Sequence, residues 1–174
     1  MSIASMEPPQ TSENIIGQHY GRVYRLCCLL LADSHEAEDV TQEVFLKAHE
    51  QARSAPVGNW GAWLTRVAVN AVHDRRRVGW WPRWRRLTDA IDEIDIASPE
   101  PTPEDVVIGA ETRERVGAAF WKLSTRQREV FVLRHLEGWS TDAVATSLGM
   151  RPGTVKRHLF RAVHALSAAV HRGG

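Results

Sequence analysis

Apolar residues recur every three or four positions along most of the chain, and this spacing constrains the fold more than any other feature. The clearest example is the set Trp60, Trp63, Leu64, Val67 and Ala68, which would share one face of a helix. No run of four or more alternating apolar and polar residues competes as a strand. We therefore predict an all-α protein, and 174 residues leave room for one ordinary domain or two small ones.

The N-terminal half has the pattern of a three-helix bundle. Residues 1–10 are polar and carry prolines, which predicts a disordered start. Helices are expected over 11–32, from 33 to about 52 and over 60–78, with a loop at 54–59. Asp33 is followed three residues later by Glu36, the spacing that begins a helix with a capping box.

The helical periodicity fails between residues 79 and 103. Four prolines fall in this stretch, and residues 87–110 contain seven acidic and no basic side chains. Proline makes such a segment stiff and extended, while like charges repel one another. We interpret 79–103 as a flexible acidic linker, so the fold is expected to be two small helical bundles, over 11–78 and 104–174.

The C-terminal half has the helix start and end signals of a helix-turn-helix. Helices are expected from about 104 to 123, then over 124–137, 140–148 and 152–171, with serines at two starts and glycines after two ends. The last two would form the helix-turn-helix, whose second helix enters the major groove of DNA. Its buried stripe is expected to contain Val155, Leu159, Ala162, Val163 and Leu166.

The first turns of the last helix are basic, and residues 126–174 carry eight Lys or Arg against three acidic side chains. Arg and Lys reach the acceptors of guanine, Thr contacts the thymine methyl, and a helix N-terminus favours phosphate. A solvated polar face on an ordinary helical hairpin is the alternative. The side chains expected to face outward are Arg151, Thr154, Lys156, Arg157, His158 and Arg161.

A second candidate nucleic-acid surface lies on the helix expected over 60–78. Tryptophans next to Arg and Asn are suited to stacking on unpaired bases while holding the backbone. For either Trp60 or Trp63 alone, a place in the core is the alternative.

Other classes of protein find little support in the sequence. No nucleotide-binding or nucleophile motif is present, and we expect no catalytic residue, metal, cofactor or small-molecule substrate. A small hydrolase using His73 and Asp74 is an alternative. Cys27 and Cys28 are adjacent, so they cannot join distant segments and are expected to be buried. Without an apolar run of membrane-spanning length or a leader pattern, we expect a cytoplasmic protein.

Four motifs, in order along the chain, resemble those of bacterial extracytoplasmic function (ECF) sigma factors. They are Ala37-Glu-Asp-Val-Thr-Gln-Glu-Val-Phe-Leu-Lys-Ala48, Gly61-Ala-Trp-Leu-Thr-Arg-Val-Ala-Val-Asn70, Leu123-Ser-Thr-Arg-Gln-Arg-Glu-Val-Phe-Val-Leu-Arg134 and, after Leu136-Glu-Gly138, Gly153-Thr-Val-Lys156. The resemblance covers roughly residues 12–78 and 106–170. It departs at Arg157 and His158, where many members have Ser then Arg, which affects the exact promoter sequence.

The resemblance implies a dissociable subunit of bacterial RNA polymerase. The first domain would bind core polymerase and the −10 promoter element, and the second the −35 element and the flap region. An anti-sigma factor, membrane-bound in some systems, would hold the protein inactive. For docking on the clamp of the largest subunit it implies Asp39, Gln42 and Glu43. For the −10 element it implies Trp63, Arg66, Asn70 and Arg75, and for the −35 element Arg134, Thr154, Lys156, Arg157 and Arg161.

The alternative function is a stand-alone helix-turn-helix regulator with an N-terminal sensor or dimerisation bundle. A regulator would bind a two-fold symmetric operator by itself. A sigma factor would need core polymerase to bind a promoter specifically and to melt it.

Overall fold

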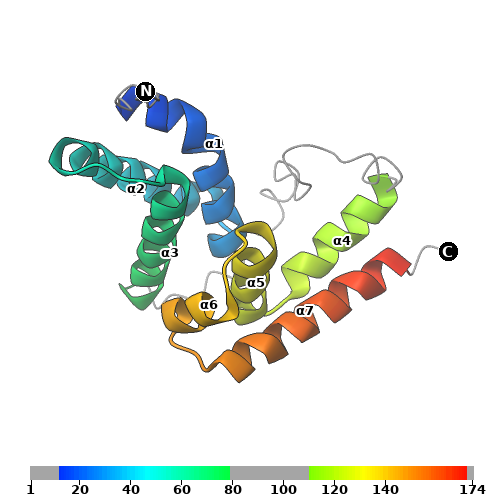
Figure 1. Cartoon of the computed structure of the whole chain (residues 1–174). Helices are drawn as coiled ribbons and strands as arrows, with labels where there is room; N and C mark the ends of the chain where they lie inside the picture. The colour runs from blue at the N-terminus through cyan, green and yellow to red at the C-terminus, as the bar shows by residue number, and fades with distance from the viewer. Residues whose placement is uncertain (1–11, 79–109, 172–174) are drawn as a thin grey trace, which may run out of the picture. The chain divides into compact units, whose positions relative to one another are not determined.

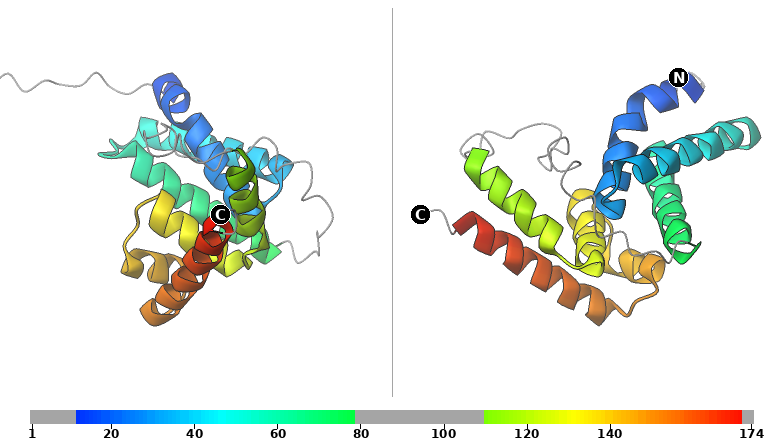
Figure 2. Two further views of the ribbon diagram at one scale, coloured as in Figure 1. Left: turned by 90° about the vertical axis from the view of Figure 1, so that its right-hand side faces the viewer. Right: turned by 180° about the vertical axis from the view of Figure 1, so that it is seen from behind.

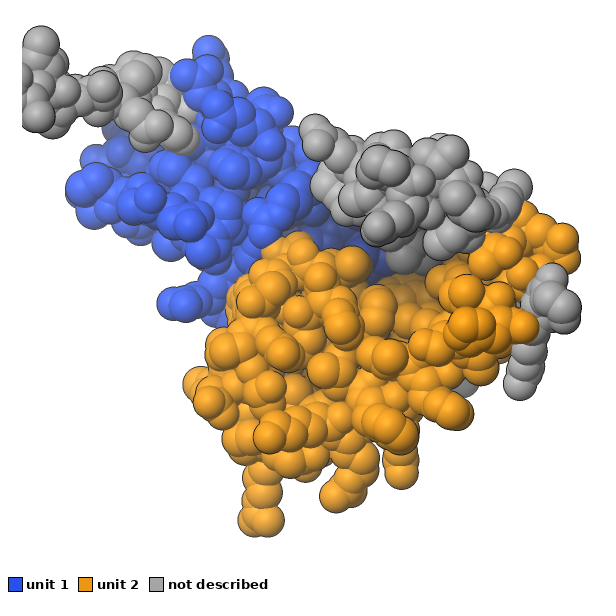
Figure 3. Space-filling view, turned by 45° about the vertical axis from the view of Figure 1, so that its right-hand side comes forward, with its two compact units in different colours: residues 1–82 blue, residues 83–174 orange. Residues whose placement is uncertain are grey.

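The computed structural model describes residues 12–78 and 110–171, and both stretches consist of helices and short turns (Figure 1). The predicted all-α fold is confirmed. The chain divides into two compact units, residues 1–82 and 83–174 (Figure 3). The expected disordered start, the linker 79–103 and the first turns of the helix expected from 104 lie outside the described residues.

The described residues of unit 1, 12–78, form three helices, and each packs against the other two (Figure 2). They are α1 (Ser12–Leu31), α2 (Ser34–Ser54) and α3 (Trp60–Val78). Their apolar faces meet in a core in which Cys27, Val40 and Leu64 are fully buried. Cys27 and its neighbour Cys28 act here as small apolar side chains, as predicted. Burial raises the pKa of the Cys27 thiol to about 11, so this thiol stays protonated at neutral pH.

The turn between α1 and α2 is set by local chemistry. Ala32 ends α1 in the left-handed conformation, with φ of 58°. Asp33 is then extended, and its carboxylate accepts a hydrogen bond of 3.0 Å from the backbone N–H of Glu36. This bond satisfies one of the free donors at the start of α2. The predicted start of the helix at Asp33 is therefore confirmed.

Unit 2 is built around its last helix. It contains α4 (Ala110–Lys122), α5 (Thr125–Phe131), α6 (Thr141–Leu148) and α7 (Pro152–His171). The long helix α7 packs against α4, α5 and α6, and Val155, Ala162 and Leu166 of its buried stripe lie in the core. In Figure 2, α4 and α7 lie side by side along most of α4. The arrangement of α6 and α7 is the expected helix-turn-helix.

The caps of unit 2 follow the sequence signals. Ser124 forms a complete capping box with Gln127 at the start of α5, and Ser140 caps α6 through the N–H of Ala143. Gly138 and Gly149 follow helix ends with φ of 68° and 62°. Only glycine adopts this conformation without strain, which explains both turns.

One helix differs from its prediction. The helix expected over 124–137 changes after Phe131 into a π-helical turn, Val132–Leu136. In this turn the N–H of Glu137 donates to the carbonyl of Val132, five residues back, at 3.0 Å. The N–H of Trp139 then donates to Leu133 at 2.9 Å and closes the chain reversal around Gly138.

Candidate functional surfaces

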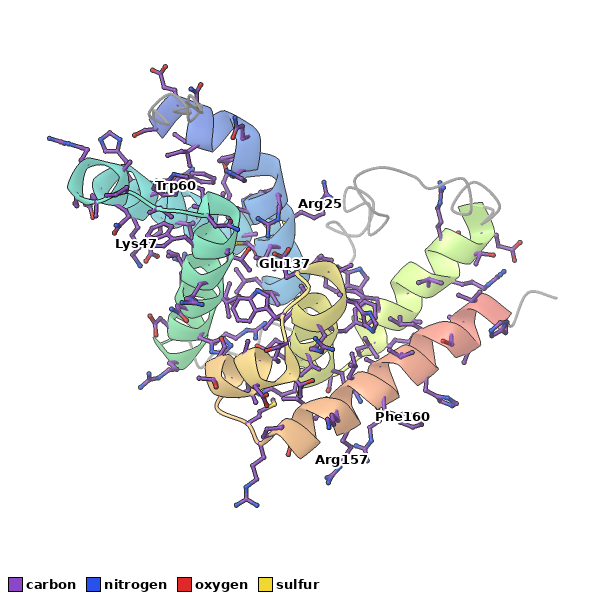
Figure 4. The ribbon with its side chains drawn as sticks, viewed as in Figure 1. Arg25, Lys47, Trp60, Glu137, Arg157 and Phe160 are labelled. Carbon is purple, nitrogen blue, oxygen red and sulfur yellow. The ribbon has the colours of Figure 1, made fainter. Side chains whose placement is uncertain are left out.

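The N-terminal half of α7 presents a cationic face. The side chains of Lys156, Arg157 and Arg161 are exposed and Thr154 is half-buried, because Val155 and Ala162 take the positions that face the core. In Figure 4, Arg157 projects from α7 on the side away from α5 and α6. The structure therefore brings four of the five predicted −35 residues together on one short stretch of helix.

The fifth predicted −35 residue, Arg134, is engaged inside its own turn. It lies in the π-helical turn, is half-buried, and donates a hydrogen bond from Nη1 to the backbone carbonyl of Trp139. This bond spans the reversal around Gly138 and holds α5 to the loop before α6. Sequence reasoning missed this structural contact.

His158 is half-buried, which corrects the expectation that it faces away from the core. Its Nδ1 is buried and has no hydrogen-bond partner. Burial lowers the pKa of His158, and the nearby charges of Arg161, Arg126 and Arg157 lower it further, whereas Glu129 acts in the opposite direction. The imidazole is therefore neutral at pH 7 and adds no charge to the cationic face.

The outer face of α7 also carries apolar side chains that sequence reasoning did not assign. Val163, expected in the core, is 37% exposed, and Phe160 is 71% exposed. The expectation for Val163 is wrong, because the buried positions of α7 are taken by Val155, Ala162 and Leu166. Phe160 follows Arg157 by one helical turn, and Figure 4 shows both on the outer side of α7. The spacing of Phe160 from Arg157 could have revealed, from the sequence, that both side chains lie on the outer face.

The exposed face of α2 is acidic and amide-bearing. Asp39, Gln42 and Glu43 share one face at positions i, i+3 and i+4, and Leu46 continues it at i+7. The Glu43 carboxylate accepts from Lys47 Nζ at 2.7 Å. Leu46 is 67% exposed and was missed by sequence reasoning, although its spacing from Gln42 and Glu43 could have revealed it.

Two residues predicted for different functions meet in an ion pair. The Nη2 atom of Arg75 in α3 lies 2.7 Å from Oδ2 of Asp39 in α2. The Arg75 Nε atom is also 3.8 Å from Oε2 of Glu36. A residue expected to bind polymerase is thus joined to one expected to bind the −10 element.

The start of α3 carries an aromatic pair. Trp60 is buried and Trp63 is half-buried, and their rings meet edge to face with centroids 5.5 Å apart and planes at 74°. Arg66 and Asn70 follow Trp63 at i+3 and i+7 and are exposed. Trp63 therefore has one edge supported by Trp60 while part of its surface stays open next to two polar side chains.

Neither a metal-binding cluster nor a membrane-spanning helix occurs within residues 12–78 and 110–171. Within residues 12–78 and 110–171, no group of three or more His, Cys, Asp or Glu side chains could hold a metal ion, so His73 and Asp74 gain no further ligand. None of the helices described is long and apolar enough to span a bilayer.

An all-helical fold with a helix-turn-helix fits the sigma-70 class of transcription factors, and the family models show that class. The family model "Sigma-70 region 2" matches residues 15–82, and "Sigma-70, region 4" matches residues 113–166. The chain is 34% identical to the ECF RNA polymerase sigma factor SigL of Mycobacterium tuberculosis, over 90% of this chain and 87% of SigL. It is 28% identical to SigW of Bacillus subtilis, over 88% of this chain and 85% of SigW.

A solved structure has the same fold. The sigma factor RpoE of Bartonella quintana, crystallised with the anti-sigma factor NepR, superposes with a TM-score of 0.57 at 23% identity, over 93% of this chain and 98% of RpoE. The chain belongs to the ECF RNA polymerase sigma factors, and the predicted family is confirmed. It is an alternative sigma factor, which directs RNA polymerase to promoters and takes part in transcription initiation.

Proposed function

We propose that three exposed surfaces divide the work of this sigma factor. The α2 face binds core polymerase, the exposed edge of α3 binds the −10 element, and the cationic face of α7 binds the −35 element. The observation that carries this proposal is that an acidic face and a cationic recognition helix occur in one chain. A partner for the first must be basic and a partner for the second must be anionic.

The polymerase-binding surface consists of Asp39, Gln42, Glu43 and Leu46. The acidic and amide side chains would pair with basic and polar groups on the clamp of the largest subunit. The exposed Leu46 at the end of the same face would lose its contact with water on docking, and this burial would slow dissociation. Unit 2 would contact the flap region of the polymerase.

The −10 surface consists of Trp63, Arg66, Asn70 and Arg75. A base that leaves the duplex would stack on the open part of the Trp63 ring, while Arg66 and Asn70 hold the backbone or the base edge. Because stacking is available only to an unpaired base, this interaction favours the melted promoter. Binding energy would therefore drive melting, and we propose no catalytic activity for the protein.

The −35 surface consists of Thr154, Lys156, Arg157 and Arg161, and Arg134 supports it from the turn before α6. Arg side chains on the first turns of α7 would reach guanine edges in the major groove, and Lys156 would contact phosphate. The exposed ring of Phe160 would contact thymine methyl groups or sugars. Arg134 would act chiefly by holding the turn before α6, since its guanidinium already bonds to the Trp139 carbonyl.

An anti-sigma factor is proposed as the regulator of this protein. RpoE of Bartonella quintana, which shares the fold, was crystallised with the anti-sigma factor NepR, and this motivates the same kind of partner here. Units over 11–78 and 104–174, joined by the linker 79–103, would be held together by that partner. The protein would act in the cytoplasm, or wait at the inner face of the membrane when its anti-sigma factor is membrane-bound.

The polymerase-binding surface is tested by replacing Asp39 and Gln42 with Ala. We expect the double variant to lose most of its binding to core polymerase and its transcription from a cognate promoter, with unchanged helical circular dichroism. Glu13→Ala, which removes an exposed acid from α1, is the matched control and should behave like the wild type. Normal polymerase binding by the Asp39 and Gln42 variant would contradict the assignment.

The alternative, a stand-alone regulator, is tested by footprinting without polymerase. A sigma factor should protect a promoter specifically only when core polymerase is present. Specific protection of a two-fold symmetric site by the purified chain alone would favour the regulator instead.

A further inference from the structure

The ion pair between Asp39 and Arg75 joins two surfaces that the proposed function assigns to different partners. Their closest atoms are 2.7 Å apart, and both side chains remain accessible, with 63% of the Asp39 side chain and 36% of the Arg75 side chain exposed. Both members of the pair are accessible to a third molecule. A polymerase or a DNA strand can therefore approach either member.

The two proposed partners of this pair have opposite charges. A basic group of polymerase would be attracted to the Asp39 carboxylate, and a promoter phosphate would be attracted to the Arg75 guanidinium. Each would have to displace or weaken the contact that the other residue already makes. An exposed ion pair is worth little, so displacement is easy and its effect is a few-fold change in affinity.

We propose that Arg75 competes with core polymerase for Asp39, and that Asp39 competes with promoter DNA for Arg75. When a cationic group of polymerase takes over Asp39, Arg75 is released toward the DNA backbone, and DNA bound at Arg75 likewise frees Asp39. Such a coupling is reciprocal by thermodynamic necessity. The inference rests on the proposed function, because it assumes that Asp39 faces polymerase and Arg75 faces DNA.

Glu36 limits how far Arg75 is released. Its Oε2 atom lies 3.8 Å from Arg75 Nε, so a second carboxylate remains near the guanidinium when Asp39 is engaged elsewhere. Replacing Glu36 with Gln should therefore strengthen DNA binding in the polymerase complex. This second carboxylate also explains why removing Asp39 alone should give only part of the maximal effect.

The decisive test measures the affinity of core polymerase without DNA. Arg75→Gln should bind core about 2- to 5-fold more tightly than the wild type, because Asp39 no longer has a competing cation. Arg77→Gln removes an exposed positive charge two residues further along α3 and is the control for long-range charge effects. Unchanged or weaker binding by Arg75→Gln, or an equal gain with Arg77→Gln, would overturn the proposal.

The reciprocal test uses the full chain alone with a short DNA duplex of random sequence. Asp39→Asn should bind this duplex about 2- to 5-fold more tightly, with a steeper dependence on salt, because one more cation is available to phosphate. Adding Arg75→Gln should abolish the gain, and Glu38→Gln should not reproduce it. A gain that persists in the Asp39 and Arg75 double variant would count against competition.

The docking surface and the competition between Arg75 and polymerase are tested separately by these variants. If Asp39→Asn left core affinity unchanged, the proposed docking surface itself would be wrong. If Asp39→Asn weakened core binding but Arg75→Gln did not strengthen it, the docking surface would stand and the competition would fall.

Discussion

The guanidinium of Arg22 in α1 donates a hydrogen bond of 2.7 Å from Nη2 to Oγ1 of Thr65 in α3, where Thr65 is buried. A second bond, 3.2 Å long, runs from Nη1 to the carbonyl oxygen of Gly61. The same side chain thus fixes two points on the first turns of α3. These turns carry Trp63, so Arg22 acts as a positioning residue for the proposed stacking surface.

Replacing Arg22 with Ala should lower the free energy of unfolding by about 1–2 kcal/mol, because two hydrogen bonds to the start of α3 are lost. Urea denaturation of the full chain measures this change. Arg25→Ala is the control, since Figure 4 shows Arg25 pointing away from α3, and it should cost less. Equal losses of unfolding free energy in both variants would show that the contacts of Arg22 to α3 add no stability.

Trp63→Ala should reduce formation of the open complex by about 5- to 150-fold, which corresponds to the loss of one base stack of about 1–3 kcal/mol. Trp63→Phe, which keeps an aromatic ring, should recover part of this activity. Permanganate reactivity of promoter thymines reports the melted state directly. If Trp63→Ala opened promoters normally, the ring would have only a packing role against Trp60.

Two glycines of the helix-turn-helix should respond oppositely to the same substitution. Gly149→Ala should destabilise the protein by about 1 kcal/mol, because φ of 62° strains any residue with a Cβ atom. Gly153→Ala should stabilise it by about 0.5–1 kcal/mol, because Gly153 is helical and an added Cβ meets no atom within 4 Å. Thermal unfolding should show shifts of opposite sign, and shifts of the same sign would contradict this account.

Stability should fall in alkaline solution because of Cys27. Its pKa is raised from 9.0 to about 11 in the folded protein, so above pH 9 the unfolded chain ionises first and gains stability. Below pH 9 the contribution of the protonated Cys27 thiol to the free energy of unfolding is fully present. This contribution is lost as pH rises toward 11, by about 2 kcal/mol at pH 10.5. Cys27→Ala should show a correspondingly smaller fall in unfolding free energy between pH 8 and 10.5. An identical pH dependence in both proteins would refute the role of this thiol.

The parts of the fold that depend on local chemistry were predictable from the sequence. Asp33, Ser124 and Ser140 begin helices, and Gly138 and Gly149 end them, because each effect acts within three or four residues of the signal. The same holds for the cationic stretch of α7, whose spacing alone places Lys156, Arg157 and Arg161 outside the core.

The features that depend on tertiary packing were not predictable. The π-helical turn at Val132–Leu136 leaves no signal, because apolar residues at 132, 133 and 136 also suit an α-helix. The exposure of Val163 depends on which positions of α7 the neighbouring helices cover. The ion pair of Asp39 and Arg75 joins residues 36 positions apart, and only the packing of α2 on α3 brings them together.

The π-helical turn at Val132–Leu136 changes the direction of the chain between α5 and α6. An α-helix advances about 100° per residue, so the additional residue accommodated in this turn redirects everything that follows it. Deleting one residue from this turn would leave the caps, glycines and basic side chains of unit 2 in the sequence, and we expect it to change the angle at which α6 and α7 follow α5. The length of this one turn therefore sets the direction of the helix-turn-helix independently of the side chains that α7 carries.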